Sequence, residues 1–196
     1  MRRVGNDVVD LEDPAIAHTH LRDRFISRVC APSERRSLAA AADKKLRLWS
    51  LFAAKEAAFK ALSKSGPLVF AHSRFVVTAD LRSVSYESEV LWLRVDVDGP
   101  CVHAIAWTDD EVPLAGVRQI REGMDSGLAA RALLLVALGT EGLSVARAPA
   151  PGSWNGFGPP KLFREGREVN LDISLSHDGR FVAFAADSSG AQRIKP

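Results

Sequence analysis

The segment "DKKLRLWSLFAAKEAAFKAL", residues 43–62, predicts the longest helix of the chain. Ala, Leu and Lys favour a helix, and the segment contains neither Gly nor Pro. Positions 49, 52, 56 and 59 share one helix face, so Glu56 falls within a stripe of aromatic side chains. A carboxylate on a buried face is costly unless it is paired or binds a cation. Alternatively, Glu56 lies at the edge of the stripe and reaches solvent or Lys60.

Period-two patterns on both sides of this helix predict strands. Residues 3–11, "RVGNDVVDL", form one that carries Asp7, and a helix over 14–29 and another from an N-cap at Ser33 to about residue 42 follow it. Three more strands are predicted at 73–80, 89–99 and 101–110, with Asp98-Gly99 as a hairpin turn. We expect an antiparallel sheet, in which His103 is a packed strand residue and not a ligand.

The last third of the chain predicts a helix and a hairpin. Asp125 or Ser126 begins a helix that ends near Gly139, and residues 147–163, rich in Pro, Gly and Ala, are expected to form a loop. Two apolar strands, 167–176 and 180–187, are joined by a turn that contains His177. Taken alone, His177 is either a solvated turn residue or a functional one. The tail from residue 188 is expected to fray.

Bulk composition excludes several classes of protein. With 196 residues and 46% apolar residues the chain can bury a core, and its net charge of +2 gives no sign of nucleic-acid binding. Its two cysteines lack the spacing of a disulfide framework or a zinc site. The N-terminus does not look like a secretory signal, and no apolar run is long enough to span a bilayer. These features predict a soluble, cytoplasmic protein that binds no membrane.

Three stretches together resemble the 4'-phosphopantetheinyl transferases. Members carry a G-x-D strand motif, a W-x-x-K-E-A helix motif with a further Lys four residues after the Glu, and an S-x-S-H motif. The matching residues here are Gly5 and Asp7; Trp49, Lys55, Glu56 and Lys60; and Ser174, Ser176 and His177. The segment "RFISRVCAPSE", residues 24–34, also resembles the family's segment before the K-E-A helix.

The order of the motifs implies an unusual organisation. The chain has the G-x-D, K-E-A, S-H order of the short, trimeric holo-acyl-carrier-protein synthases, but the length of the fused enzymes, in which S-H comes first. The resemblance therefore implies an α+β fold of two pseudo-symmetric halves, each with a small antiparallel sheet packed on helices. Residues 1–118 would carry the first two motifs and residues 119–196 the S-x-S-H motif. The site would lie between the halves of a monomeric pseudo-dimer.

The resemblance also implies an activity and the residues that perform it. The phosphopantetheine arm of coenzyme A would move to a serine of an apo acyl, polyketide or peptidyl carrier protein, releasing 3',5'-ADP. Asp7 and Glu56 would bind Mg²⁺, an ion that prefers carboxylate and phosphate oxygens. Val9 stands where longer members carry a second acid, and Asp10, on the other strand face, is not assigned to the metal.

Further roles follow from the same resemblance. Glu56, or a metal-bound water that it polarises, would be the base for the serine hydroxyl. The expected contacts to coenzyme A come from Lys55, Lys60, Ser176, His177, Arg131 and Lys161. Arg24 and Arg28 either face the acidic carrier protein or form a solvated helix face. The alternative to an enzyme is a module of the same fold that binds coenzyme A or a carrier protein without catalysis.

Overall fold

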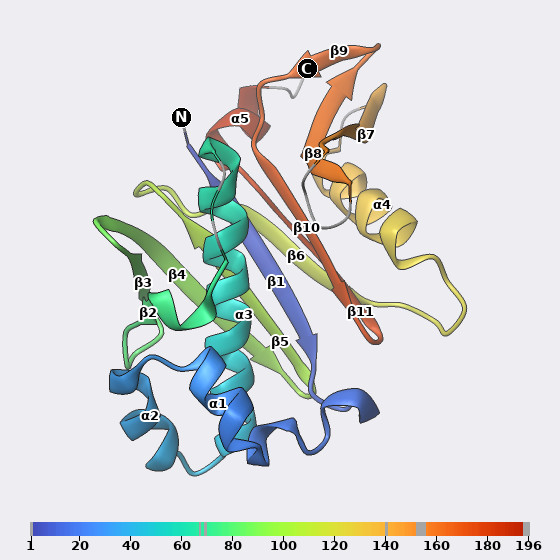
Figure 1. Ribbon diagram of the computed structural model, residues 1–196. Coiled ribbons are helices and arrows are strands. Elements are labelled where there is room, and N and C mark those ends of the chain that lie inside the picture. The colour runs from blue at the N-terminus through green and yellow to red at the C-terminus, as the bar shows by residue number, and fades with distance from the viewer. Residues whose placement is uncertain (1, 67, 69, 140, 152–155, 194–196) are drawn as a thin grey trace.

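The computed structural model describes residues 2–66, 68, 70–139, 141–151 and 156–193. It is a mixed α+β structure of antiparallel sheets and helices (Figure 1). The first part contains β1 (Val4–Asp10), α1 (Asp23–Val29), α2 (Pro32–Ala39), α3 (Lys44–Leu62), β2 (Phe75–Val77), β3 (Ser83–Tyr86), β4 (Glu89–Asp98) and β5 (Cys101–Trp107). The rest contains β6 (Leu114–Gln119), α4 (Ser126–Leu138), β7 (Leu143–Pro149), β8 (Phe157–Arg164), β9 (Arg167–Val169), β10 (Ile173–Asp178), β11 (Phe181–Ala186) and α5 (Ser188–Arg193).

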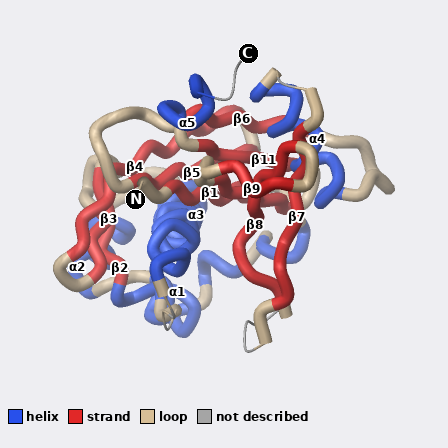
Figure 2. The backbone as a smooth tube through the Cα atoms, turned by 90° about the horizontal axis from the view of Figure 1, so that it is seen from above, coloured by secondary structure: helices blue, strands red, loops and turns tan. Residues whose placement is uncertain are grey.

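The first sheet has the strand order β1-β5-β4-β3-β2, and α3 packs across one face of it, as the view in Figure 2 shows. Alanines on α3 allow a close approach to β1. At Gly5 a Cβ atom would lie 2.0 Å from the carbonyl oxygen of Ala57, so no other residue fits without moving the helix. This contact sets the distance between the two elements that carry Asp7 and Glu56.

A second sheet, with the order β10-β11-β6, lies against β1 and β5 on the side away from α3. Two small apolar clusters join the sheets, one around Val4 and Ala185 and the other around Val8 and Phe181. Helix α4 packs on β10 and β11, and a third sheet, β7-β8-β9, extends beyond them (Figure 1). The predicted boundary between residues 118 and 119 falls inside β6, which pairs with β11, and the division into two halves stays a prediction.

The predicted helices at 43–62 and 125–139, the hairpin of strands 89–99 and 101–110 and the strand 180–187 are confirmed. The single strand predicted at 167–176 is divided: residues 167–169 form β9 of the third sheet, and β10 begins only at Ile173. Asp43 caps α3 through Leu46 N, and Asp125 caps α4 through Leu128 N. Gly139 ends α4 in the left-handed conformation, with φ at 63°. Among the described residues, no helix combines the length and apolar character required to cross a bilayer.

Several local predictions were wrong. Residues 14–29 form two 3₁₀ turns, Pro14–Ile16 and Thr19–Leu21, before α1, and α2 begins at Pro32 without a cap from Ser33. The expected loop at 147–163 contains the end of β7 and most of β8, apart from residues 152–155, which lie outside the described residues. Residues 188–193 form α5 where fraying was predicted, and residues 194–196 lie outside the description. His177 belongs to β10, because the turn is Gly179-Arg180.

Candidate active site

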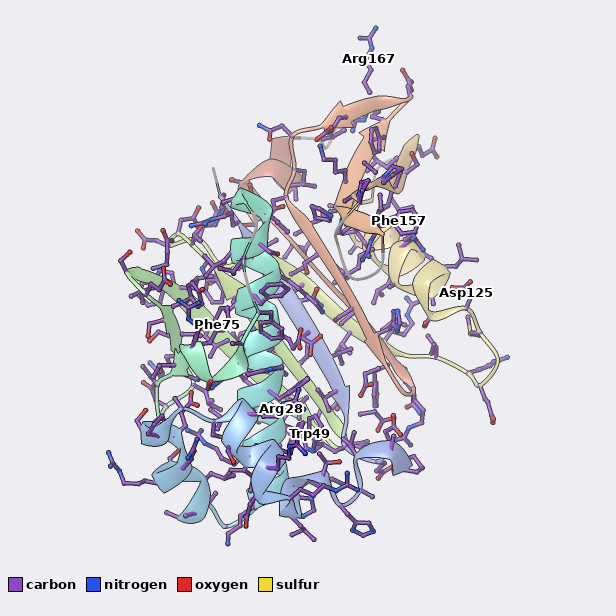
Figure 3. All side chains as sticks on the ribbon, viewed as in Figure 1. Arg28, Trp49, Phe75, Asp125, Phe157 and Arg167 are labelled. Carbon is purple, nitrogen blue, oxygen red and sulfur yellow. The ribbon has the colours of Figure 1, made fainter. Side chains whose placement is uncertain are left out.

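A pocket of about 290 Å³ lies where β1, α3 and β10 meet. Its carboxylates come from all three elements, and its apolar wall includes two aromatic residues of α3. Figure 3 labels one of these, Trp49, at the end of α3 that lies beside α1. The lining residues are Asp7, Val8, Val9, Ile16, Trp49, Phe52, Glu56, His177 and Asp178.

Asp7 lies in β1 on the strand face that packs against α3. The ammonium group of Lys60 donates to its Oδ1 at 2.7 Å and to the carbonyl oxygen of Asn6 at 3.1 Å. Burial raises the pKa of the Asp7 carboxyl to about 6, with further contributions from the charges of Glu56 and Asp178, while Lys60 opposes the shift. With Glu56 and Asp178, Asp7 brings three carboxyl groups into one pocket, which favours a cation.

Glu56 projects from the middle of α3 into the same pocket and is about one-fifth exposed. Its Oε1 lies 3.2 Å from Nε2 of His72, in the 3₁₀ turn His72–Arg74. The sequence analysis missed His72, because nothing in the local pattern of residues 70–74 distinguishes it from an ordinary loop histidine. Only the approach of this loop to α3 reveals the contact.

The buried position of Lys55 conflicts with the predicted contact between this residue and the phosphates of coenzyme A. Lys55 is fully buried, and its Nζ donates to Glu34 Oε2 at 2.5 Å and to the carbonyl oxygen of Val29 at 2.7 Å. Successive helix residues point about 100° apart, so Lys55 faces α1 and α2 when Glu56 faces the pocket. Lys55 is thus a structural cation that joins α3 to the segment before it.

Ser176, another expected contact to coenzyme A, is also turned away from the pocket. Adjacent strand residues point to opposite sheet faces, and His177 rather than Ser176 lines the pocket. The Ser176 hydroxyl accepts a hydrogen bond from Nδ2 of Asn6 at 2.8 Å, and the Ser174 hydroxyl accepts one from the Asn6 backbone N–H at 3.0 Å. The two serines of the S-x-S-H motif therefore join β10 to β1.

The hairpin that carries His177 is held against β1 by Asp10. The buried Asp10 carboxylate accepts two hydrogen bonds from the Arg180 guanidinium, both at 2.7 Å, and one from the Arg180 backbone N–H. These bonds hold the pKa of Asp10 below its usual range. Asp178 in turn accepts from the backbone N–H of Asp10 at 2.8 Å. Sequence analysis assigned Asp10 no role and missed Arg180.

Neither Lys161 nor Arg131 lines this pocket. Lys161, on β8, donates to both carboxylate oxygens of Glu168 on β9, near the sheet end where Figure 3 labels Arg167. Arg131, on α4, directs Nη1 toward the helix N-terminus: a Cβ atom added to Gly127 would lie 3.1 Å from it.

A larger cavity of about 930 Å³ borders the hairpin turn. It is lined by residues 119–124, Ser126, Gly179 and Arg180. Two adjoining residues of one hairpin, Asp178 and Gly179, therefore belong to the linings of two different cavities.

The donor set fits a hard divalent cation. Asp7 and Glu56 place two carboxylates in one pocket, whereas no arrangement of three or more His, Cys, Asp or Glu side chains suited to a metal occurs in the described part of the chain. Mg²⁺ is commonly bound by one or two carboxylates, with water and phosphate oxygens completing the octahedron. Two carboxylates are consistent with that pattern.

One comparison with known proteins finds the family that the sequence resembles. Residues 3–93 match the family model of the 4'-phosphopantetheinyl transferase superfamily, so the predicted resemblance is confirmed over this segment, a little less than half of the chain. A solved structure, the holo-[acyl-carrier-protein] synthase of Thermotoga maritima, is similar over 86% of each chain, with 18% identity and a TM-score of 0.40. A search of curated proteins gives no match.

Proposed function

We propose that the protein transfers the phosphopantetheine arm of coenzyme A to a serine of an apo carrier protein, with Mg²⁺, and releases 3',5'-ADP. The observation that supports this most strongly is the pocket itself. Asp7 and Glu56 come from the segment that matches the superfamily, and His177 comes from a hairpin more than one hundred residues further along the chain, yet all three line one cavity.

Asp7 and Glu56 are the proposed ligands of Mg²⁺. When bound, the ion supplies charge neutralisation for the pyrophosphate group. Burial is the largest cause of the raised pKa of the Asp7 carboxyl, because it disfavours the charged form, and a bound cation would stabilise that form.

Glu56 is the proposed acceptor of the serine proton. In the balanced step, the serine oxygen forms a bond to the β-phosphorus of coenzyme A and the bond from that phosphorus to the bridging oxygen breaks. Its electron pair leaves with 3',5'-ADP, and the hydroxyl proton moves to Glu56. A general base must lie within hydrogen-bond reach of the proton that it takes, which requires the serine to enter beside α3.

Lys60 and His177 supply the remaining polar groups. Lys60 is about one-third exposed and ion-paired to Asp7, so its ammonium lies at the border of the pocket. His177 is exposed on β10 and lines the pocket. Both are proposed to donate to phosphate oxygens, since a donor fixed before the reaction stabilises developing charge without reorganisation.

The nucleotide end of coenzyme A is proposed to occupy the larger cavity. This cavity shares the β10–β11 turn with the pocket, so an extended ligand can pass from one to the other beside His177. Arg131 remains the proposed contact for a phosphate at this end, since it points toward the N-terminus of α4, where Ser126 lines the cavity. Lys161, ion-paired to Glu168, is less well placed for this role.

A monomer suffices for the proposed activity, because Asp7, Glu56 and His177 of a single chain line the same pocket. The proposed carrier-protein contacts include Arg24 and Arg28, both exposed on α1. Positive charge there would complement an acidic partner and raise its association rate.

The test is the intact mass of apo carrier proteins of fatty-acid, polyketide and peptide synthesis after incubation with the protein and coenzyme A, with Mg²⁺ or with EDTA. At least one carrier is expected to gain the mass of a single phosphopantetheine arm, and only with Mg²⁺. If a correctly folded protein modifies none of the three classes, a non-catalytic binding module becomes the better account.

A further inference from the structure

His72 occupies a defined place beside Glu56. It lies ten residues beyond the end of α3, in the short turn that returns the chain to β2. Its ring centroid is 4.8 Å from that of Phe52 and 4.2 Å from that of Phe70. Two aromatic contacts fix the plane of the imidazole, so that Nε2 faces Oε1 of Glu56 at 3.2 Å.

Few contacts other than the one with His72 orient the Glu56 carboxylate. Within the described ranges, the contact with His72 is the one side-chain hydrogen bond or ion pair of its carboxylate. Asp7 differs, because the ammonium of Lys60 holds it directly. A glutamate has three rotatable side-chain bonds, and without a partner its carboxylate would sample several rotamers. The hydrogen bond from His72, whose ring is stacked on Phe52, restricts the Glu56 carboxylate to one rotamer.

Building on the proposed function, we infer that His72 is a positioning residue for the cation site. It donates through Nε2–H to one oxygen of Glu56 and leaves the second oxygen for the metal ion. Hydrogen-bond partners of metal-binding carboxylates orient them, and losing such a partner typically lowers metal affinity by about 10- to 100-fold. His72 itself touches neither the ion nor the substrate in this account.

A purely structural role predicts a different outcome. If His72 only filled the space between Phe52 and Phe70, then another aromatic ring would serve equally well. The His72→Phe variant keeps a ring in that place and removes the donor. The His72→Gln variant keeps an N–H donor and removes the ring. The two variants therefore separate orientation of Glu56 from packing.

The experiment is a titration of Mn²⁺ monitored by electron paramagnetic resonance, with coenzyme A present. Mn²⁺ serves as the probe because it accepts the same oxygen ligands as Mg²⁺. We expect His72→Phe to bind Mn²⁺ at least about tenfold more weakly than the wild type, and His72→Gln to recover part of the loss. Thermal unfolding midpoints of all three proteins establish that they are folded.

The outcomes are distinguishable. Equal Mn²⁺ affinity of the wild type and His72→Phe overturns the role of His72 and leaves the proposed function standing. Failure of the wild type itself to bind Mn²⁺ removes the proposed cation site, and the inference with it. Should His72→Phe not fold, the imidazole ¹⁵N resonances of His72 in the wild type provide the test. They are expected to shift when Mg²⁺ and coenzyme A are added, and unchanged resonances overturn the inference.

Discussion

Asp7 is a largely buried carboxyl that shares its pocket with two other carboxyl groups, Glu56 and Asp178. Its pKa of about 6 means that the carboxyl holds a proton up to that pH, whereas an exposed aspartate would already be ionised. A cation and a proton compete for the same oxygens. The ionised form, which the cation requires, predominates only above about pH 6.

This competition predicts how metal affinity depends on pH. As the pH falls through 6, the apparent Mn²⁺ affinity is expected to drop by about tenfold per unit, because one proton must be displaced from Asp7. Titrations between pH 5 and 8 measure the slope. The Asp7→Asn variant should bind Mn²⁺ weakly at every pH in this range. Its affinity should not show the pH dependence that arises from the Asp7 proton. An affinity in the wild type that is constant across pH 6 would contradict the assignment of Asp7.

The sequence identified functional candidates where a charged side chain interrupted an apolar pattern. Asp7 in a strand and Glu56 in an aromatic stripe stood out for this reason, and the structure places both in one pocket with His177. Lys55 lies next to Glu56 in the motif, but its buried contact with Glu34 depends on how α2 packs. His72 was missed because its partner is on another element.

At the scale of elements, the pair of Lys55 and Glu34 joins α3 to α2 and to β2. Glu34 also accepts from the backbone N–H groups of Val77 and Ala31. Burial lowers the pKa of the Lys55 ammonium, while Glu34 opposes the change. Such a pair is costly to break by removing only one partner.

We therefore expect Lys55→Met to reduce the free energy of unfolding by about 3–5 kcal/mol, because Glu34 is left charged and buried. Chemical denaturation measures the loss. The transfer rate per folded molecule should change little, since Lys55 does not line the pocket. A stable variant that has lost coenzyme A binding would restore the role that the sequence predicted for Lys55.

A substitution at Gly5 tests the close contact between β1 and α3. The Gly5→Ala variant is expected to lose about 1–3 kcal/mol or more of stability, because its Cβ would overlap the backbone of Ala57. Gly158→Ala is the control, since the nearest atom to its Cβ would be 3.6 Å away. Denaturation midpoints of the two variants give the comparison, and equal midpoints would argue against the tight β1–α3 contact.

At the scale of the molecule, polar contacts tie β1 to the β10–β11 hairpin at three levels. Lys64 binds Asp172 and the carbonyl oxygens of Val4 and Ile173. Asn6 joins the serines of β10, and Asp10 binds Arg180 at the turn. The residues of β1 and those of the hairpin are more than one hundred positions apart in the sequence, and the pocket exists only where the two segments meet. No pattern within either segment could have predicted the pairing.

The Asp10–Arg180 contact should matter for both stability and binding. Arg180→Gln is expected to lower the midpoint of chemical denaturation, since the buried Asp10 loses charged donors. It should also raise the KM for coenzyme A more than it lowers kcat, because the turn borders both cavities. Arg82→Gln is the control, since Arg82 is exposed and 4.0 Å from Asp80. Identical effects of the two substitutions would contradict this role.

The overall α+β architecture followed from the two strong helices and the period-two segments. The third sheet did not, because Pro, Gly and Ala in residues 147–163 favour turns locally, whereas β7 and β8 are stabilised by pairing with each other. Strand β6 was missed for a similar reason: its pairing with β11 outweighs a weak pattern of its own.

The central claim is that Glu56 and Asp7 form the site of phosphopantetheine transfer, and one measurement tests it most directly. The rate of holo-carrier formation, followed by intact mass with coenzyme A and Mg²⁺, is compared between the wild type, Glu56→Gln and the exposed control Glu89→Gln. We predict a loss of at least about 100-fold for Glu56→Gln and little change for Glu89→Gln. Equal rates for the wild type and a folded Glu56→Gln would contradict the account.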